Sequence, residues 1–141
     1  LAPVTLGEIE KFVVQYQPRW VIVDQLRNLA MKETNKVLQL EYAATGMRNL
    51  AKKYNLIAVS TTQAGDSAEG KRLLTMGDVD FSNTGIPAQA DVLIGIGATP
   101  EDSAMGMRYA SVCKNKRGGG HAQVPLRIRT DISRYTDHNG N

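Results

Sequence analysis

The chain has 141 residues, enough for one hydrophobic core and little more. A hydrophobic content of 42% and a charged content of 22% are ordinary for a globular domain, and no apolar run approaches the length that spans a membrane. The 17 basic and 14 acidic residues give a net charge of +3, which is compatible with a polyanionic partner but does not require one. The single cysteine, Cys113, excludes an internal disulfide and suits a cytosolic protein.

The chain begins with the pattern of a helix followed by a strand. Thr5 and Glu8 have the spacing of a capping box, in which each side chain satisfies a backbone amide of the other at a helix start. Apolar residues then recur at helical spacing until Pro18, which ends the helix. The next segment, Trp20 to Asp24, is a short apolar run that predicts a buried strand ending in a carboxylate.

A second helix and a second strand follow. The segment between Asp24 and Asn35 is mixed and polar, which predicts a loop or a short irregular helix. Apolar residues return at helical spacing from Leu40 to Tyr54, and Leu56 to Gln63 predicts another buried strand, which ends in an amide. The order helix, strand, helix, strand predicts two parallel strands joined by a right-handed crossover.

The second half of the chain changes in character. Periodicity is absent from Ala64 to Gly85, and a stretch of that length inside a compact domain is usually functional or mobile. Three more strands are then predicted, with a turn over Pro100 to Gly106 and a hairpin at the glycine triplet, residues 118–120. These strands are Asp91 to Ile96, Arg108 to Lys114 and Val124 to Ile128, and Pro125 places the last of them at an edge or a bulge. We expect one domain over residues 1–135 and a flexible tail over residues 136–141.

Two polar side chains end the two predicted parallel strands. Ligands of open parallel sheets bind outside the carboxyl ends of the strands, so we expect Asp24 and Gln63 to lie side by side at one site. Neither residue has a packing reason to follow the apolar run before it. A strand that simply ends at solvent is the alternative explanation for each.

Four short motifs occur in a recognisable order: Val21 to Asp24, Ser60 to Gln63, Gln89 to Val92 and Lys114 to Gly118. Through them the chain, from about Val4 to Tyr135, resembles the second half of a RecA-like motor domain, closest to the hexameric replicative DNA helicases of the DnaB and phage type. The resemblance implies an α/β fold: a RecA-like P-loop NTPase core fragment, with a parallel sheet flanked by helices and a C-terminal β-hairpin. It also implies ATP and Mg²⁺ as cofactors, single-stranded DNA as a partner, a ring hexamer, and the cytosol of a bacterium or a phage-infected host.

The resemblance gives each strand end a role. Asp24 would be the Walker B acid, which holds Mg²⁺ against the phosphates of ATP. Gln63 would be the sensor that hydrogen-bonds the γ-phosphate or its attacking water, because an amide donates and accepts without adding charge.

The same resemblance makes Ala64 to Gly85 the loop that grips single-stranded DNA, with Lys71 and Arg72 as its phosphate contacts. Composition alone supports this role poorly. The loop has more acidic than basic residues, and Phe81 is its only aromatic residue.

Lys114, Lys116 and Arg117 place three cations on the predicted hairpin beside the glycine triplet. From this position the family supplies an arginine finger and a companion lysine to the ATP of the neighbouring subunit. Lys116 stands where the family has its arginine, and Arg117 follows it. We favour Arg117 as the finger because a guanidinium suits the spreading charge of a phosphoryl group in transfer; a solvated loop tip is the alternative.

Gly65 to Lys71 has the spacing of a phosphate-binding P-loop up to its last position, but we reject the match. Arg72 replaces the hydroxyl residue that should reach Mg²⁺, and Asp66 and Glu69 would place carboxylates in an anion cradle. The segment also follows the Walker B strand instead of preceding it. With no P-loop and no catalytic glutamate upstream of Asp24, we expect a C-terminal half of a helicase motor that does not hydrolyse ATP alone.

Other chemistries find little support in the sequence. His121, His138 and Cys113 lack partners at metal-ligand spacing, and no nucleophile constellation is readable, which removes zinc sites and most hydrolases. Two alternatives to a helicase remain. One is another RecA-like ATPase, such as a recombinase or a KaiC-type protein, and the other is a non-catalytic module that binds nucleic acid or a protein partner.

Overall fold

The structure is a computed structural model that describes residues 3–80 and 84–137. The chain divides into two compact units. Unit 1 comprises Leu1–Gln63 and Asp80–Ala90, and unit 2 comprises Ala64–Val79 and Asp91–Asn141. Each unit has its own β-sheet.

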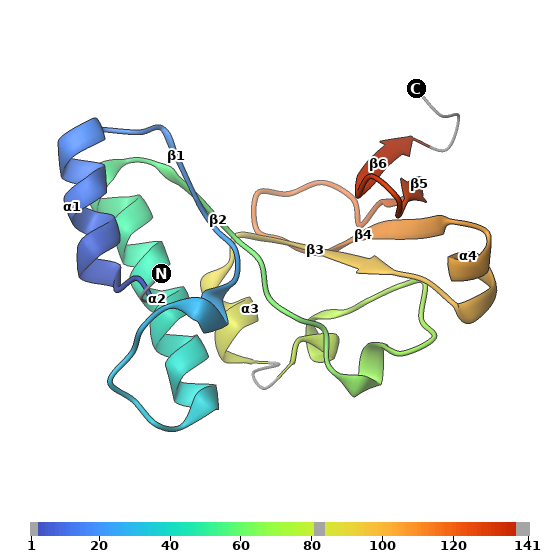
Figure 1. Ribbon diagram of the computed structural model, residues 1–141, viewed down its shortest axis with the longest axis horizontal. Coiled ribbons are helices and arrows are strands. Elements are labelled where there is room, and N and C mark those ends of the chain that lie inside the picture. The colour runs from blue at the N-terminus through green and yellow to red at the C-terminus, as the bar shows by residue number, and fades with distance from the viewer. Residues whose placement is uncertain (1–2, 81–83, 138–141) are drawn as a thin grey trace. The chain divides into compact units, whose positions relative to one another are not determined.

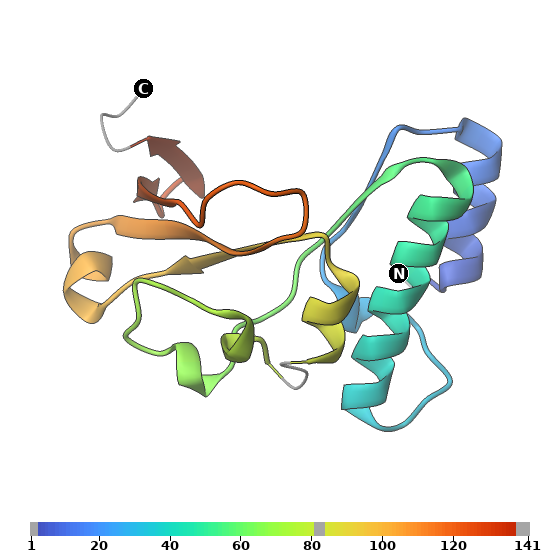
Figure 2. The ribbon, with the colours of Figure 1, turned by 180° about the vertical axis from the view of Figure 1, so that it is seen from behind.

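Unit 1 combines helices with a two-stranded parallel sheet. The helices α1 (Leu6–Tyr16) and α2 (Lys36–Tyr54) lie side by side (Figures 1 and 2). β1 (Trp20–Val23) pairs in parallel with β2 (Ile57–Ser60), as the sequence predicts. A 3₁₀ helix, η1 (Leu26–Asn28), follows β1. A short helix that begins at the last residue of the predicted loop, α3 (Gly85–Gln89), contacts α2.

The ends of the two long helices follow from local sequence. At the start of α1, the Glu8 N–H donates to Thr5 Oγ1 at 3.2 Å and the Thr5 N–H donates to Glu8 Oε2 at 2.8 Å, which confirms the predicted capping box. Asn35 caps α2 by accepting from the amides of its second and third residues. The helix ends at Asn55, whose left-handed backbone (φ 51°) is typical of a C-cap.

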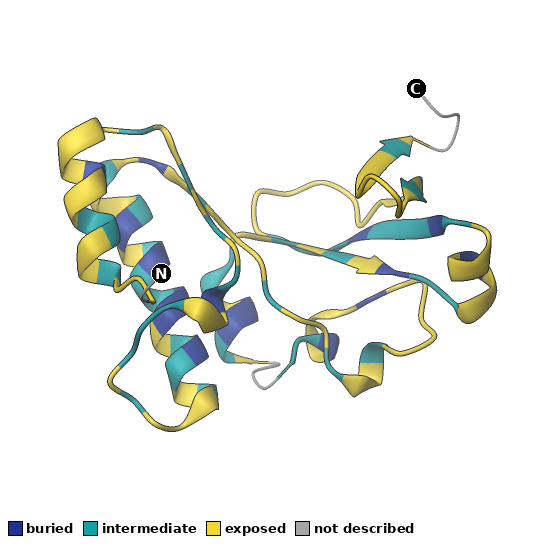
Figure 3. Ribbon diagram, in the orientation of Figure 1, coloured by how far each residue is buried: buried dark blue, intermediate teal, exposed yellow. Residues whose placement is uncertain are grey.

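The core of unit 1 is apolar. Val13, Leu50 and Leu56 form a buried cluster, and Val21 packs against it together with Ala58, its partner across the parallel strands. In Figure 3 the buried residues, drawn in dark blue, run along α2. Further buried side chains lie where α2 contacts η1 and α3: Leu26, Leu40, Ala43, Ala44, Met47 and Ile86.

Unit 2 is a four-stranded antiparallel sheet in the order β3-β4-β5-β6. Its strands are β3 (Val92–Gly97), β4 (Met107–Asn115), β5 (Gln123–Arg129) and β6 (Arg134–Asp137). The predicted hairpin between β4 and β5 is confirmed. A short helix, α4 (Pro100–Ala104), joins β3 to β4 where we expected a turn.

The predicted fold needs two corrections in unit 2. The third strand is not part of a parallel sheet in the described residues: β3 pairs only with β4, and the short connection through α4 makes that pair antiparallel. The sequence also did not predict β6, and this strand includes Thr136 and Asp137, which we had assigned to a flexible tail. The rest of that tail, residues 138–141, lies outside the described residues.

Residues 64–79 are more ordered than the sequence predicts. Ala64 forms an antiparallel bridge with Val79, and two 3₁₀ helices, η2 (Asp66–Ala68) and η3 (Met76–Asp78), lie between them. The segment approaches β3 so closely that a Cβ on Gly97 would lie 2.3 Å from the Lys71 carbonyl oxygen. A glycine is therefore required at position 97. No helix in the described part of the chain is long and apolar enough to cross a membrane.

Candidate functional site

The strand-end site lies where β1 and β2 end together. Asp24 directly follows β1 and Thr61 directly follows β2. The Thr61 N–H donates to the Val23 carbonyl at 3.1 Å, its carbonyl accepts from the Leu26 N–H at 3.1 Å, and its hydroxyl donates to Asp24 Oδ1. Thr61 therefore holds both the backbone around Asp24 and the exposed carboxylate itself.

Gln63 lies two residues beyond Thr61. Its side chain is exposed, and its carbonyl accepts from the Asp80 N–H at 3.0 Å. Within the described residues no hydrogen bond joins the Asp24 and Gln63 side chains, so a shared role for them stays a prediction. Sequence analysis missed Thr61, although a hydroxyl directly after the second strand was a readable signal.

A second link at this end of unit 1 is an ion pair. Arg27 in η1 donates to Asp80 Oδ2 at 3.1 Å. This ion pair joins η1, which follows Asp24, to Asp80, whose backbone N–H donates to the Gln63 carbonyl. The two loops that leave the parallel strands are therefore tied to each other by side chains as well as by Thr61.

The strand-end site has the donor chemistry for a hard cation. In the part of the chain that the structure describes, no group of three His, Cys, Asp or Glu side chains could hold a metal without other ligands. Mg²⁺, however, is commonly held by one or two carboxylates together with phosphate and water oxygens. The exposed Asp24 carboxylate, oriented by Thr61, fits that mode of binding.

Lys71, a predicted DNA contact, is bonded to a buried carboxylate. Its Nζ donates to Asp78 Oδ1 at 2.8 Å, and Asp78 is 3% exposed. Asp78 also accepts from the Thr75 N–H at 2.8 Å and from the hydroxyls of Ser67 and Thr75. These bonds, with that of Lys71 the strongest, hold the pKa of Asp78 well below its usual value.

Arg72, the other predicted DNA contact, is bonded in the same way. Its guanidinium makes two bonds to Asp102, at 2.7 and 2.8 Å, and lies 4.9 Å from the centre of the Tyr109 ring. Asp102 is fully buried and shares a capping box with Thr99. The bonds from Arg72, followed by those from Thr99, lower the pKa of Asp102 to about 2.

The Arg72–Asp102 pair joins residues 64–79 to α4, and the Lys71–Asp78 pair braces the segment internally. Sequence analysis missed Asp78 and Asp102, although both lie three residues after a threonine, the spacing of a capping box. The side chains of Lys71 and Arg72 remain about half exposed, at 48% and 51%. Their DNA contacts stay predictions, and their charges are largely compensated within the fold.

The geometry of Gly65 to Lys71 agrees with the rejection of this segment as a P-loop. The only helix in it is the three-residue η2, and its lysine is bonded to Asp78. The segment lines an open cavity of about 390 Å³, into which it brings Asp66 and Glu69. Two carboxylates beside a cavity disfavour a phosphate there.

The hairpin between β4 and β5 is held at its tip by Asn115. Its Nδ2 donates to the Gly118 carbonyl at 2.7 Å, and its Oδ1 accepts from the Arg117 N–H at 3.0 Å. Gly118 adopts φ 82°, a left-handed conformation that favours glycine.

The three predicted cations of this hairpin differ in their surroundings. Lys114 is half-buried in β4 opposite Leu93. Lys116 Nζ lies 4.0 Å from Asp91 Oδ1. Arg117 is exposed, and its guanidinium has no partner among the described residues. Of the two residues considered for the finger, Arg117 therefore has its charge less compensated than Lys116, whose exposed contact with Asp91 is weak.

The remaining candidates for metal binding are engaged by backbone. His121 Nδ1 lies 2.7 Å from the Val112 carbonyl oxygen, and Cys113 Sγ donates to the Leu74 carbonyl at 3.0 Å. His138 and Phe81 lie outside the described residues.

No protein-family model matches the chain, and no curated protein matches it in sequence. Solved structures match its fold. One, described as an ATPase domain, matches with a TM-score of 0.79 and 14% identity over 95% of this chain and 51% of its own. Another, described as a DnaB-like replicative helicase and its interactions with primase, gives a TM-score of 0.76 and 14% identity over 94% of this chain and 36% of its own. This chain thus has the fold of part of these structures and spans about half of their length or less.

Proposed function

We propose that this chain is the C-terminal half of the motor domain of an ATP-dependent replicative DNA helicase. The observation that carries the proposal is the carboxylate of Asp24, oriented by the Thr61 hydroxyl at the shared carboxyl end of two parallel strands. That end is where ligands of α/β sheets bind. The fold match to an ATPase domain and to a DnaB-like helicase supports the same assignment.

In this proposal the strand-end site handles the nucleotide. Asp24 holds Mg²⁺, which, when bound, neutralises charge on the β- and γ-phosphates. Thr61 keeps the carboxylate turned toward the metal position through its hydroxyl. Gln63, exposed on the segment after β2, bonds the γ-phosphate or its water and relays nucleotide state through its backbone contact with Asp80.

The β4–β5 hairpin acts at the neighbouring subunit of the ring, and residues 64–79 act on the DNA. Arg117, with Lys114 and Lys116 beside it, reaches the ATP of a neighbouring subunit in a ring hexamer. The exposed guanidinium of Arg117 supports this assignment. Lys71 and Arg72 contact single-stranded DNA with the exposed halves of their side chains, and their ion pairs with Asp78 and Asp102 weaken each contact.

The test is strand separation on a forked DNA duplex by the complete protein that carries these residues. Asp24→Asn keeps the shape of the side chain and removes its charge, so we expect ATP hydrolysis and unwinding to fall by about 100-fold or more. Glu10→Gln, which removes a surface carboxylate on α1 away from the strand-end site, is the matched control and should leave both rates unchanged. Hydrolysis that survives Asp24→Asn would remove Asp24 as the metal ligand, and hydrolysis without unwinding in the wild type would favour a recombinase or KaiC-type ATPase.

Thr61 offers a finer test of the same site. Thr61→Val removes the hydroxyl and keeps the shape, so we expect the Mg²⁺ concentration for half-maximal hydrolysis to rise about fivefold, from one lost hydrogen bond. Thr61→Ser should restore it, and Thr62→Val should not change it.

For the 141-residue chain alone we expect no nucleotide turnover above buffer, because the P-loop-like segment lines its cavity with Asp66 and Glu69 and its Lys71 is bonded to Asp78. Hydrolysis that depends on Mg²⁺ and disappears in Lys71→Ala would contradict this and restore Gly65 to Lys71 as a P-loop.

A further inference from the structure

Three arginines share one face of the β5–β6 hairpin in unit 2. Arg129 of β5 lies directly opposite Arg134 of β6, and Arg127 lies opposite Thr136. Residues directly opposite each other in an antiparallel pair point to the same face, and side chains two apart along a strand do so as well. Arg127, Arg129 and Arg134 therefore form a single surface, the arginine face, and all three are exposed.

The arginine face carries more positive charge than the chain itself balances. Arg129 bonds to Asp131, with distances of 2.8 and 3.4 Å. Arg127 and Arg134 have no side-chain partner among the described residues. Like charges directly opposite each other destabilise a sheet, so the Arg129–Arg134 pair has an unfavourable energy that a bound anion would remove.

The arginine face continues toward Arg72. In the ladder between β4 and β5, Tyr109 lies opposite Pro125 and Met107 lies opposite Arg127, so Tyr109 is on the same face of the sheet. Arg72 lies over the ring of Tyr109. Four guanidinium groups thus share this face with two bonded carboxylates, Asp102 and Asp131.

We propose that the arginine face binds the phosphate backbone of single-stranded nucleic acid. Guanidinium groups suit phosphate because they make two parallel bonds to its oxygens. Tyr135 lies opposite Ile128, on the other face, and Arg72 already lies over the ring of Tyr109, so binding here relies on phosphates and not on base stacking. The choice of DNA over RNA rests on the proposed function, whereas the recognition of phosphates does not.

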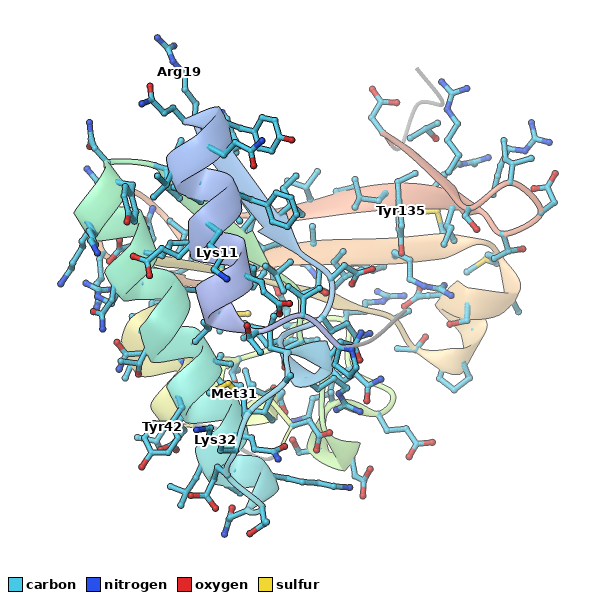
Figure 4. The ribbon with its side chains drawn as sticks, turned by 60° about the vertical axis from the view of Figure 1, so that its left-hand side comes forward. Lys11, Arg19, Met31, Lys32, Tyr42 and Tyr135 are labelled. Carbon is cyan, nitrogen blue, oxygen red and sulfur yellow. The ribbon has the colours of Figure 1, made fainter. Side chains whose placement is uncertain are left out.

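Unit 1 supplies a matched control. Its cations Lys11, Arg19 and Lys32 are exposed and lie far apart along the unit, with Arg19 beyond the end of α1 pointing outward (Figure 4). The double substitution Arg19→Gln and Lys32→Gln removes the same net charge as Arg127→Gln and Arg134→Gln. The two doubles therefore separate a local site from a general effect of charge.

The experiment measures binding of the 141-residue chain to fluorescein-labelled oligo-dT of about 16 nucleotides by anisotropy across a salt series. We expect Arg127→Gln/Arg134→Gln to weaken binding about tenfold and to reduce the salt slope by about 1.4, from two lost phosphate contacts at about 0.7 each. The unit 1 double should leave the slope nearly unchanged. Equal losses in the two doubles, or no binding by the wild type, would overturn the proposal.

A substitution that should strengthen binding to oligo-dT provides a second, independent test. Asp131→Asn frees the guanidinium of Arg129, so we expect binding to oligo-dT to tighten several-fold; unchanged or weaker binding would contradict the proposal. Comparable binding of oligo-U would support recognition of the backbone. Complete displacement of oligo-dT by millimolar inorganic phosphate would instead show a simple anion site.

Two precautions keep the result interpretable. Because the three arginines are exposed, thermal melting should be unchanged in the variants, and Arg127→Gln alone carries the test if Arg134→Gln disturbs the edge strand. No arm requires ATP. A failure here therefore leaves the motor proposal intact, and a failure of Asp24→Asn leaves this one intact.

Discussion

The interiors of the two units differ in the kind of residue that they bury. Among the described residues, ten apolar side chains are buried in unit 1, Pro87 included, and two, Leu74 and Met107, in unit 2. The buried polar residues of the part that the structure describes, Asp78, Asp102 and Ser111, are all in unit 2. Unit 1 is therefore stabilised mainly by removal of apolar surface from water, whereas residues 64–79 of unit 2 are held by charge pairs and hydrogen bonds.

This difference predicts different responses to the same stress. Apolar packing does not depend on the protonation of any group, so unit 1 should tolerate acid. The bonds to Asp78 and Asp102 exist in full only while both carboxylates are charged. The stability of unit 1 should therefore depend on the packing of its apolar core, and the stability of unit 2 should depend on pH.

The largest effect that separates the units is expected from Leu50→Ala. Leu50 is 6% exposed in the cluster with Val13 and Leu56, so the substitution should lower the free energy of unfolding by about 2–5 kcal/mol. Urea denaturation gives the total loss, and hydrogen exchange resolved by segment locates it. We expect faster exchange in α1 and α2. Equal acceleration in β4 would mean that the two interiors unfold as one cooperative structure.

The next effect is the acid sensitivity of unit 2. Because the folded pKa of Asp102, about 2, lies below its ordinary value of 3.8, its contribution to stability is present above about pH 4 and is lost as the pH falls toward 2. We expect hydrogen exchange in β3 and β4 to accelerate over that window. Asp102→Asn should lower Tm at pH 7 by about 5 °C or more and flatten the pH dependence. The half-exposed Arg72 keeps this effect below that of a fully buried pair.

Unit 1 also has carboxylates with a lowered pKa, and these can be compared with the buried carboxylates of unit 2. The Thr5 amide lowers the pKa of Glu8, and Lys53 lowers that of Glu10. Both act at the surface, where solvent screens the interaction, so they should contribute little to acid unfolding. If exchange in α1 accelerates as much as in β4 between pH 4 and 2, buried ion pairs are not the cause.

What the sequence could predict follows the same division. In unit 1 the periodic helices, the capping box at Thr5 and the two apolar runs ending at polar residues define the elements, because local patterns determine them. In unit 2 the strands around Gly118 were predictable, but β6 was not. The four residues of β6 show no alternation of apolar and polar side chains, and the position of this strand depends on its pairing with β5.

The candidate sites show the same limit. Asp24 could be found because a strand end is a local signal, and Thr61 was missed because its role appears only when β2 lies beside β1. Lys71 and Arg72 look like free cations in the sequence. Their carboxylate partners lie 7 and 30 residues away, and nothing in the local pattern reveals that pairing.

The smallest expected effect is at the tip of the β4–β5 hairpin of unit 2. It shows whether local backbone geometry, and not packing, determines the conformation of this turn. Gly118 has φ 82°, and an added Cβ would meet no atom within 4 Å, so Gly118→Ala should cost about 1 kcal/mol through backbone strain alone. Gly120 has the same open surroundings but no left-handed backbone, so Gly120→Ala should be neutral or slightly stabilising. Chemical denaturation of both variants measures the difference. Equal losses would show that the left-handed backbone at Gly118 is not what makes this position sensitive, and the hairpin would then owe its shape to the sheet and not to the local geometry of its turn.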